Sequence, residues 1–231
     1  MAGMNPASST DHPHRHIWGI AYPAIMAKSS APLVGLLDTW AIGHLPGAVH
    51  LAAVGLGSVI CSYLRWAFGF LRMGTTGLVA QARGRDDLHE QVVVVIRSSV
   101  LALFFGVLLL GLQEWLLAVS LQLMAPPEDV GAITAEYFRI RIWAAPATLL
   151  SYAIIGVLFG LARVRTILWL QLLLNFTNAA LNLTFVVGLG MGVPGVAWGT
   201  LIAQLLTAVV SIWMMVRIYG APALLAALRE G

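Results

Sequence analysis

The sequence predicts an all-α membrane protein, a bundle of six transmembrane helices with both termini in the cytoplasm. Of its 231 residues, 59% are hydrophobic and only 10% are charged, and the mean hydropathy is +0.86. These values lie outside the range of soluble domains. A membrane-spanning β-barrel would show short alternating strands, and the sequence has no such pattern. A helical bundle in a lipid bilayer is therefore the expected fold.

Six apolar segments are long enough to cross a bilayer, since about 20 helical residues span about 30 Å of hydrocarbon. In chain order they cover residues 17–42, 50–78, 92–118, 133–160, 167–188 and 193–218. Together they form a transmembrane lobe over residues 17–219. A polar cytoplasmic tail at 1–16 precedes the lobe, and an amphipathic cytoplasmic tail or linker at 220–231 follows it.

The first expected span contains two prolines and two ionisable residues. Pro23 and Pro32 each remove a backbone donor, so we expect a kinked helix. Asp38 is the acidic residue placed well inside a span, and an ionisable group inside a membrane is a functional hypothesis by default. Lys28 lies about 80° from Asp38 on an ideal helical wheel, so an ion pair between them would need the kink. That structural pair is the alternative to a functional role.

The second span carries a narrow polar face. Its members are Ser58, Ser62, Arg65, Gly69, Arg72 and Thr76. Such a face cannot lie against lipid, where each unpaired polar group costs a few kcal/mol.

The third and fourth spans carry charges that fall near their expected ends. Glu114 closes the third span, and Glu136, Arg139 and Arg141 open the fourth, so we interpret all four as interfacial. Pro146 should interrupt the fourth helix because it has no backbone N–H.

Amide and hydroxyl stripes run along the fifth and sixth spans. The fifth carries Gln171, Asn175, Asn178 and Asn182. The sixth carries Thr200, Gln204, Thr207 and Ser211 at the same spacing. Each stripe stays within about 60° of one helical face. The sixth-span stripe fits interhelical hydrogen bonding better. For the fifth, hydrogen bonding between helices and the lining of a polar cavity both remain open.

Pairs of glycines four residues apart allow close helix contact in a membrane bundle. The fourth span contains Gly156 and Gly160, and the sixth contains Gly195 and Gly199.

The basic residues of the tails and loops orient the helices. They fall on one side of the expected membrane: Arg15, Arg83, Arg85, Arg163, Arg165, Arg217 and Arg229. The opposite loops have no Lys or Arg, so the positive-inside rule places both termini in the cytoplasm. The net charge of +3 and the pI near 9.4 reflect this bias, and we expect no nucleic-acid partner.

The sequence gives no support for an enzyme, a metal site or a cofactor. Its loops do not combine a nucleophile, a base and an orienting acid, and they contain no glycine-rich phosphate loop. His12, His14 and His16 alternate in the N-terminal tail without a further ligand nearby, so a solvated tail is the simpler interpretation than a metal site. Cys61 is the single cysteine, so no intrachain disulfide forms.

Four stretches of the sequence carry a family resemblance. They are PLVGLLDTWAIGHL, RWAFGFLRMGTTGLVAQARG, YFRIRIWAAPATLLSYAIIGVLFG and LLLNFTNAALNLTFVVGLGMGVPGVAWGTLIAQ. In these stretches the chain resembles the multidrug and toxic compound extrusion (MATE) family, in its DNA-damage-inducible protein F (DinF) branch. The resemblance covers nearly the whole chain.

The resemblance implies a secondary active transporter of the cell inner membrane. Such proteins have twelve helices in two lobes, and they export organic compounds against a proton or sodium gradient by alternating access. Asp38, in the motif DTxxIGHL, would be the cation-coupling residue, with a proton favoured over sodium. Its protonation would rearrange the first helix at its proline and weaken substrate binding, and Asn175 and Asn178 would belong to the same polar network.

The chain departs from the family pattern in charge and in length. Asn182 replaces a carboxylate that many relatives carry, Lys28 replaces a polar amide, and Arg65 replaces an aromatic residue, so the expected cavity is less acidic. Six spans match one lobe, and alternating access needs two. We therefore expect a truncated or split half that works with a C-terminal six-helix half or a second copy. The alternative is a non-transporting membrane fragment or scaffold subunit.

Overall fold

The structure is a computed structural model that describes residues 48–230. Within that range every regular element is a helix, which confirms the all-α prediction. Five helical segments there are long and apolar enough to cross a membrane. The span expected at 17–42, with Pro23, Lys28, Pro32 and Asp38, lies outside the described residues.

The first described span is a long helix with one interruption. It comprises α2 (Ala48–Ala67) and α3 (Gly69–Gly84), which meet at Phe68. There the Phe68 N–H donates to the Arg65 carbonyl at 3.2 Å, a three-residue turn that breaks the α-helical pattern. The span therefore extends from residue 48 to residue 84, beyond the expected 50–78.

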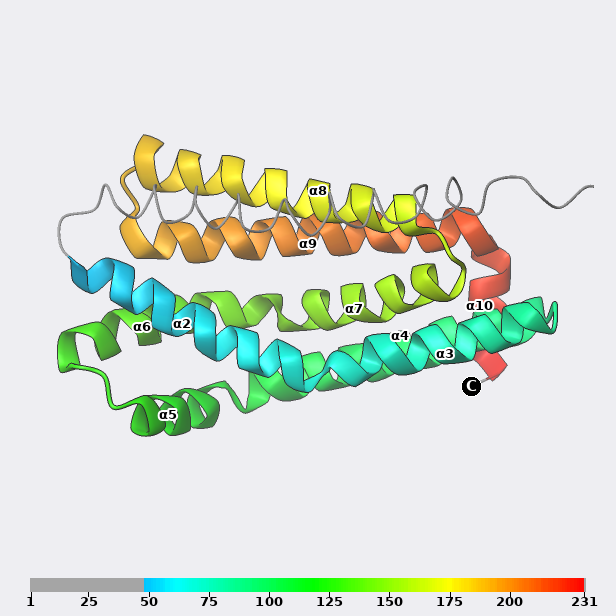
Figure 1. Cartoon of the computed structure of the whole chain (residues 1–231), viewed down its shortest axis with the longest axis horizontal. Coiled ribbons are helices and arrows are strands. Elements are labelled where there is room, and N and C mark those ends of the chain that lie inside the picture. Colours follow the sequence, from blue (N-terminus) through cyan, green and yellow to red (C-terminus); the bar gives the residue numbers. More distant parts are fainter. Residues whose placement is uncertain (1–47, 231) are drawn as a thin grey trace, which may run out of the picture.

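The expected third span is divided in the structure. α4 (Leu88–Gly111) ends before Leu112, and α5 (Gln113–Met124) is a separate short helix. α4 begins with an N-cap at Asp87, whose side chain accepts a hydrogen bond from the Glu90 N–H at 2.9 Å. α5 lies at the edge of the bundle, next to α6 (Figure 1).

The next span bends at its proline, as the sequence predicts. α6 (Glu128–Arg141) ends in a single 3₁₀ turn, η1 (Ile142–Ala144), and α7 (Ala145–Gly160) follows with Pro146 in its first turn. Because Pro146 has no N–H, the Ile142 carbonyl lacks its α-helical donor and accepts from the Ala145 N–H instead, in a 3₁₀ turn.

Two further long helices pack together on one side of the bundle. α8 (Val164–Asn182) ends in a π-helical turn, η2 (Leu183–Gly188), and the chain returns in α9 (Gly192–Tyr219). Figure 1 shows α8 and α9 side by side along their length. The amphipathic segment expected after them forms α10 (Ala221–Glu230), which packs against α4 and α9.

The α6–α7 span lies at the centre of the bundle. α7 packs against α3, α4, α8 and α9, and α6 packs against α2 and α9. Phe138, Leu149 and Leu158 are among its fully buried side chains. By contrast, the outer faces of α2, α4 and α9 expose large apolar side chains such as Trp66 and Trp213, the arrangement expected where helices meet lipid or further helices.

Candidate functional site

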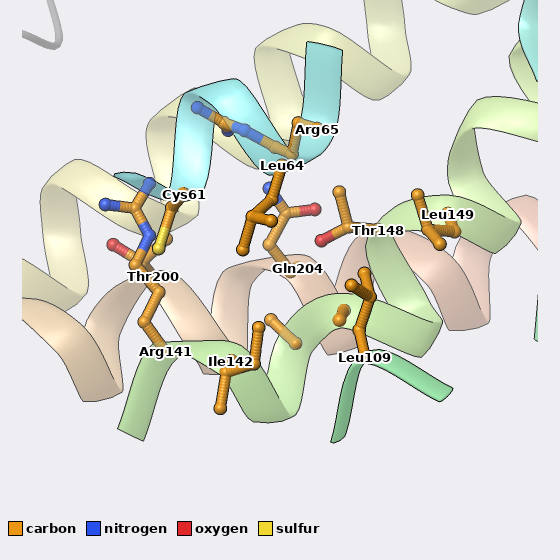
Figure 2. A pocket seen from close by; sticks show the side chains of 12 residues that line it. Cys61, Leu64, Arg65, Leu109, Arg141, Ile142, Thr148, Leu149, Thr200 and Gln204 are labelled. Atoms are coloured by element: carbon orange, nitrogen blue, oxygen red, sulfur yellow. The ribbon is translucent and has the colours of Figure 1, made fainter. Parts of the chain in front are cut away.

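A pocket opens where α6 gives way to α7 (Figure 2). Four segments contribute to it: α2, the end of α4, the α6–α7 bend and α9. The polar and charged members of its lining are Cys61, Arg65, Arg141, Thr148, Thr200 and Gln204. Water-sized molecules reach about 40 Å³ of it, which is room for a few waters or one small chemical group and not for a whole organic substrate.

The bend at Pro146 creates the pocket. The Ala145 N–H donates to the Ile142 carbonyl, so the chain turns more tightly there than in an α-helix. Gly106 of α4 lies against the bend, where a Cβ at that position would clash with the Pro146 backbone. The close approach of α4 supports the bend, and the pocket lies between the bend, Leu109 of α4, α2 and α9.

Arg141 is held in place by α2 and by its own helix. Its guanidinium donates to the Ser58 Oγ at 3.0 Å and to the Tyr137 hydroxyl, and it lies 5.3 Å from the centre of the Tyr137 ring. Tyr137 is fully buried, and its hydroxyl is 3.1 Å from the Ser58 Oγ. The interpretation of Arg141 as interfacial is therefore wrong, because it lies far inside the Glu128–Gly160 span and lines the pocket.

Arg65 brings a second positive charge to the same pocket. It is half-buried, and its Nη2 donates to the Ser62 Oγ at 2.8 Å. Arg65 and Arg141 are close enough to repel each other electrostatically. In Figure 2 both guanidinium groups extend on the side of the pocket where Cys61 lies. Between residues 48 and 230, no acidic side chain belongs to the pocket lining.

The amide stripe of α8 forms hydrogen bonds along the helix and across to α9. Gln171 donates to the Asn175 Oδ1 at 3.0 Å, and Asn182 donates to the Asn178 Oδ1 at 3.4 Å. The bond to α9 runs from the Asn178 Nδ2 to the Thr200 Oγ1, at 3.0 Å. Because Thr200 also lines the pocket, the stripe serves interhelical bonding and reaches the pocket through the same residue.

The polar residues of α9 divide into two groups. Thr207 and Ser211 are buried, and each donates to a carbonyl of its own helix, four residues earlier, at 2.8 Å. These bonds stay within α9 and do not join it to a neighbour, contrary to the interhelical role expected from the sequence. Thr200 does join α9 to α8, and Gln204 lines the pocket.

The interruption at Phe68 also divides the polar face of the second span. Ser58, Ser62 and Arg65 belong to α2 and lie near the pocket, as the bonds above show. Thr76 belongs to α3, where its hydroxyl lies 3.1 Å from the Gly156 carbonyl of α7. Arg72 is exposed, and its guanidinium carbon lies 6.0 Å from the centre of the Tyr152 ring.

An ion pair connects α5 to α6 outside the pocket. The Arg139 guanidinium donates two hydrogen bonds of 2.8 Å to the Glu114 carboxylate, and both side chains are more than half exposed. The hydrogen bond from Arg139 lowers the pKa of Glu114 below its ordinary value.

Sequence reasoning missed Arg141 as a member of the pocket. The expected span began at residue 133, which placed Arg141 near a helix end, whereas the helix begins at Glu128. The position of Arg141, five residues before a proline that breaks the helix, is the signal that would have found it. The coupling residue expected at Asp38 and the cation expected at Lys28 lie outside the described residues.

Comparison with known proteins identifies relatives over most of the chain. The MatE family model matches residues 23–184. DNA damage-inducible protein F of Escherichia coli is 34% identical over 202 residues, which cover 87% of this chain and 44% of the relative. Protein DETOXIFICATION 44, chloroplastic, of Arabidopsis thaliana is 31% identical over 92% of this chain and 45% of the relative.

The fold agrees with these relatives. A crystal structure of a MATE protein in the straight conformation superposes with a TM-score of 0.80, at 24% identity, over 89% of this chain and 46% of the solved one. The chain thus spans a little under half the length of the proteins it matches. With the family model covering more than half of its residues, the chain belongs to the MATE family.

Proposed function

We propose that this chain forms one lobe of a cation-coupled transporter that exports organic compounds across the cell inner membrane. Family membership supports transport as the general activity. The observation that carries the proposal is the pocket inside the helical bundle, which is joined to the α8 amides through the Asn178–Thr200 hydrogen bond. Polar groups gathered in this way inside a membrane bundle are typical of a substrate or ion pathway.

Asp38 is the proposed coupling residue, with a proton as the coupling ion. Protonation removes the charge of a carboxylate, so the two states of Asp38 would interact very differently with the surrounding polar groups. A site that changes charge in this way can favour one conformation of the transporter in each state. Sodium binding at the same carboxylate is the alternative coupling.

A second lobe is part of the proposal. Alternating access moves one helical body against another around a fixed site, and the helices described here form one body. The second body would be a C-terminal six-helix half or a second copy of this chain. The bound substrate would then lie between this lobe and its partner.

Uptake into inverted membrane vesicles tests the proposal. The vesicles contain this chain alone, or this chain with a candidate second half, and are offered the cationic dye ethidium and the organic anion benzoate under a proton or a sodium gradient. We expect gradient-driven uptake of at least one probe with the second half present. A protonophore should abolish it.

Two variants assign the coupling role. Asp38→Asn should abolish the uptake at an equal amount of folded protein, whereas Asp86→Asn, a matched change in the turn between α3 and α4, should leave it unchanged. Full uptake by the Asp38→Asn chain would refute the coupling role. No uptake of either probe in any pairing or gradient would instead favour a non-transporting scaffold subunit.

A further inference from the structure

We propose that the groove between α3 and α4 binds one phospholipid of the surrounding bilayer, with phosphatidylethanolamine as the preferred class. The two helices lie side by side and are joined by the turn at residues 85–87 (Figure 1). The groove between them has a volume of about 310 Å³. Binding of a lipid there is independent of the transport activity proposed above, so it can be measured without a gradient or a partner lobe.

The groove has a buried base and partly exposed apolar walls. Three of its lining residues are buried: Leu71, Thr75 and Val94. Three large apolar side chains that also line it are partly exposed: Phe70, Leu78 and Leu101. A Cβ at Gly74 of α3, another lining residue, would have no atom within 4 Å, so the groove is open there. Apolar surface of this kind on two membrane-spanning helices is suited to contact with an acyl chain.

Two oppositely charged side chains lie along the α4 wall of the groove. Glu90 is in the first turn of α4, and Arg97 follows seven residues later. Seven residues are about two helical turns, so the two residues share one face and lie about 10.5 Å apart along the helix axis. Within residues 48–230, neither side chain forms a hydrogen bond or an ion pair. Both are therefore available to a ligand in the groove.

The depth of Arg97 in its span favours a phosphate as its partner. Arg97 is exposed and lies nine residues after Leu88, about 13.5 Å into the helix, where a guanidinium that faces hydrocarbon is costly. Helical side chains lean toward the N-terminus of their helix, so Arg97 can extend toward the level of the lipid head groups. Arginine pairs with phosphate through charge-assisted hydrogen bonds. Thr75 and Ser98, which also line the groove, donate to carbonyls of their own helices, so Arg97 is the donor that the phosphate would use.

Glu90 selects the class of head group. In phosphatidylethanolamine an ammonium follows the phosphate after a two-carbon link, on the side away from the acyl chains. Glu90 lies nearer than Arg97 to the beginning of α4, so it would meet the ammonium while Arg97 meets the phosphate. An acyl chain would then lie along Phe70 and Leu101. Phosphatidylglycerol carries the same phosphate without a cation, so it would leave the Glu90 carboxylate unpaired beside a negative charge. The preference follows from the order of the two charges along α4, and the total charge of the groove does not enter it.

Native mass spectrometry of the purified full chain in detergent tests the proposal. The chain is titrated with phosphatidylethanolamine or phosphatidylglycerol, both with palmitoyl and oleoyl chains, and the bound lipids are counted. We expect the first phosphatidylethanolamine to bind with a Kd about fivefold lower than the first phosphatidylglycerol, because one more pair of opposite charges forms. Glycerophosphoethanolamine, the same head group without acyl chains, should displace little of the bound lipid at an equal concentration.

Variants of the two charged residues identify the site. Arg97→Gln should raise the Kd of both lipids about tenfold, since both carry the phosphate. Glu90→Gln should remove the preference for phosphatidylethanolamine and leave the binding of phosphatidylglycerol equal or tighter. The matched controls are Arg217→Gln on α9 and Glu136→Gln on α6, which remove the same charges from exposed positions outside the groove lining. Both controls should leave the two Kd values unchanged.

A variant without a charge change tests the groove itself. Gly74→Leu places a side chain in the open part of the groove and should weaken the binding of both lipids to a similar degree. Gly77→Leu is the control, because Gly77 is also exposed on α3 with no atom within 4 Å of its Cβ position, and it does not belong to the groove lining. Thermal unfolding checks that every variant is folded.

Several outcomes would overturn the proposal. The two lipids could bind equally well to the unchanged chain, or Arg97→Gln could have no more effect than Arg217→Gln. Complete displacement by glycerophosphoethanolamine would mean that the groove holds no acyl chain. Failure of a folded chain to bind either lipid would mean that another part of the protein or a partner covers the groove. Each of these results leaves the transport proposal untouched, whereas lipid binding without uptake of ethidium or benzoate refutes the transport proposal alone.

Discussion

The two longest spans of residues 48–230, Ala48–Gly84 and Glu128–Gly160, are in contact through both of their halves, and the two contacts differ in the side chains that fill them. Where α3 meets α7, the backbones touch: a Cβ at Gly156 would lie 2.7 Å from the Arg72 carbonyl oxygen. Where α2 meets α6, the Tyr137 ring packs against Gly57, the Tyr137 and Arg141 side chains bond Ser58, and Arg141 also lines the pocket.

The helix breaks explain how one pair of spans supports both kinds of packing. Phe68 interrupts one span and Pro146 bends the other, so each half takes its own direction. Gly156 and Gly160 let α7 approach α3 closely. The α2–α6 contact carries the larger polar groups of Arg141, Tyr137 and Ser58. We infer that the α3–α7 contact provides rigidity and that the α2–α6 region provides the site.

The largest expected effect comes from filling the close contact. Gly156→Ala would place a methyl group 2.7 Å from the Arg72 carbonyl oxygen and 2.9 Å from the Thr75 Cβ. Overpacking of this kind costs about 1–3 kcal/mol of the free energy of unfolding. Gly77→Ala on α3 is the matched control, because a Cβ there has no atom within 4 Å, and it should be neutral or stabilising. Equal stability of the two variants, measured by unfolding in detergent, would contradict the role of the contact.

A smaller effect is expected at the α2–α6 contact, which is held by hydrogen bonds. Tyr137→Phe removes the hydroxyl that bonds Ser58 and Arg141, and we expect a loss of about 1–2 kcal/mol because one partner is charged. Tyr152→Phe is the control, since the ring that faces Arg72 is kept. Unfolding midpoints measure both variants, and an unchanged midpoint for Tyr137→Phe would show that Arg141 does not depend on this hydroxyl.

Removal of a hydrogen bond between two helices should lower the free energy of unfolding more than removal of one within a single helix. Asn178→Ala breaks the α8–α9 bond to Thr200 and should lower the free energy of unfolding by about 0.5–1 kcal/mol. Ser211→Ala removes a hydroxyl whose bond stays within α9, and it should change stability by less. Comparison of the two by denaturant unfolding tests the assignment, which fails if Ser211→Ala is the more damaging change.

The smallest effect is expected at the exposed α5–α6 ion pair. Arg139 lowers the pKa of Glu114, so the folded state prefers the ionised carboxylate. The stabilisation is therefore present above the ordinary carboxyl pKa of 4.5 and is lost as the pH falls through the lowered value. Glu114→Gln and Arg139→Gln should each remove this acid-side loss and leave stability at neutral pH nearly unchanged. Stability measured against pH would contradict the pairing if only one of the two variants changed the curve.

The sequence predicts the helices well because crossing a bilayer demands long apolar runs. It also predicts the bend at Pro146 and the glycine contact at Gly156, since a missing donor and a missing side chain have direct structural results. The break at Leu112 was not predicted, because the apolar runs on both sides of Gln113 and Glu114 were interpreted as one span. Arg141 was misplaced because helix ends are the least certain part of a hydropathy pattern.

Spacing alone also could not assign hydrogen-bond partners on the polar stripes. It places Thr200, Thr207 and Ser211 on one face of α9, yet only the neighbouring helix decides which of them bonds outward. All three hydroxyls donate to a carbonyl one turn back, and Thr200 also accepts a hydrogen bond from Asn178 of α8. A threonine or serine in a helix can always satisfy itself in that way.

Transport per folded molecule tests most directly whether the α2–α6 region provides the site and the α3–α7 contact provides rigidity. Uptake of the transported probe, ethidium or benzoate, into inverted vesicles that contain a second half is measured for Arg65→Gln in the α2–α6 region and for Gly160→Ala in the α3–α7 contact, where a Cβ would lie 2.8 Å from the Val79 Cβ. The predicted result is that Arg65→Gln changes uptake per folded molecule about tenfold, while Gly160→Ala lowers the amount of folded protein and leaves uptake per molecule unchanged. Unchanged uptake per molecule in Arg65→Gln, or an equal change in both variants, would contradict the account.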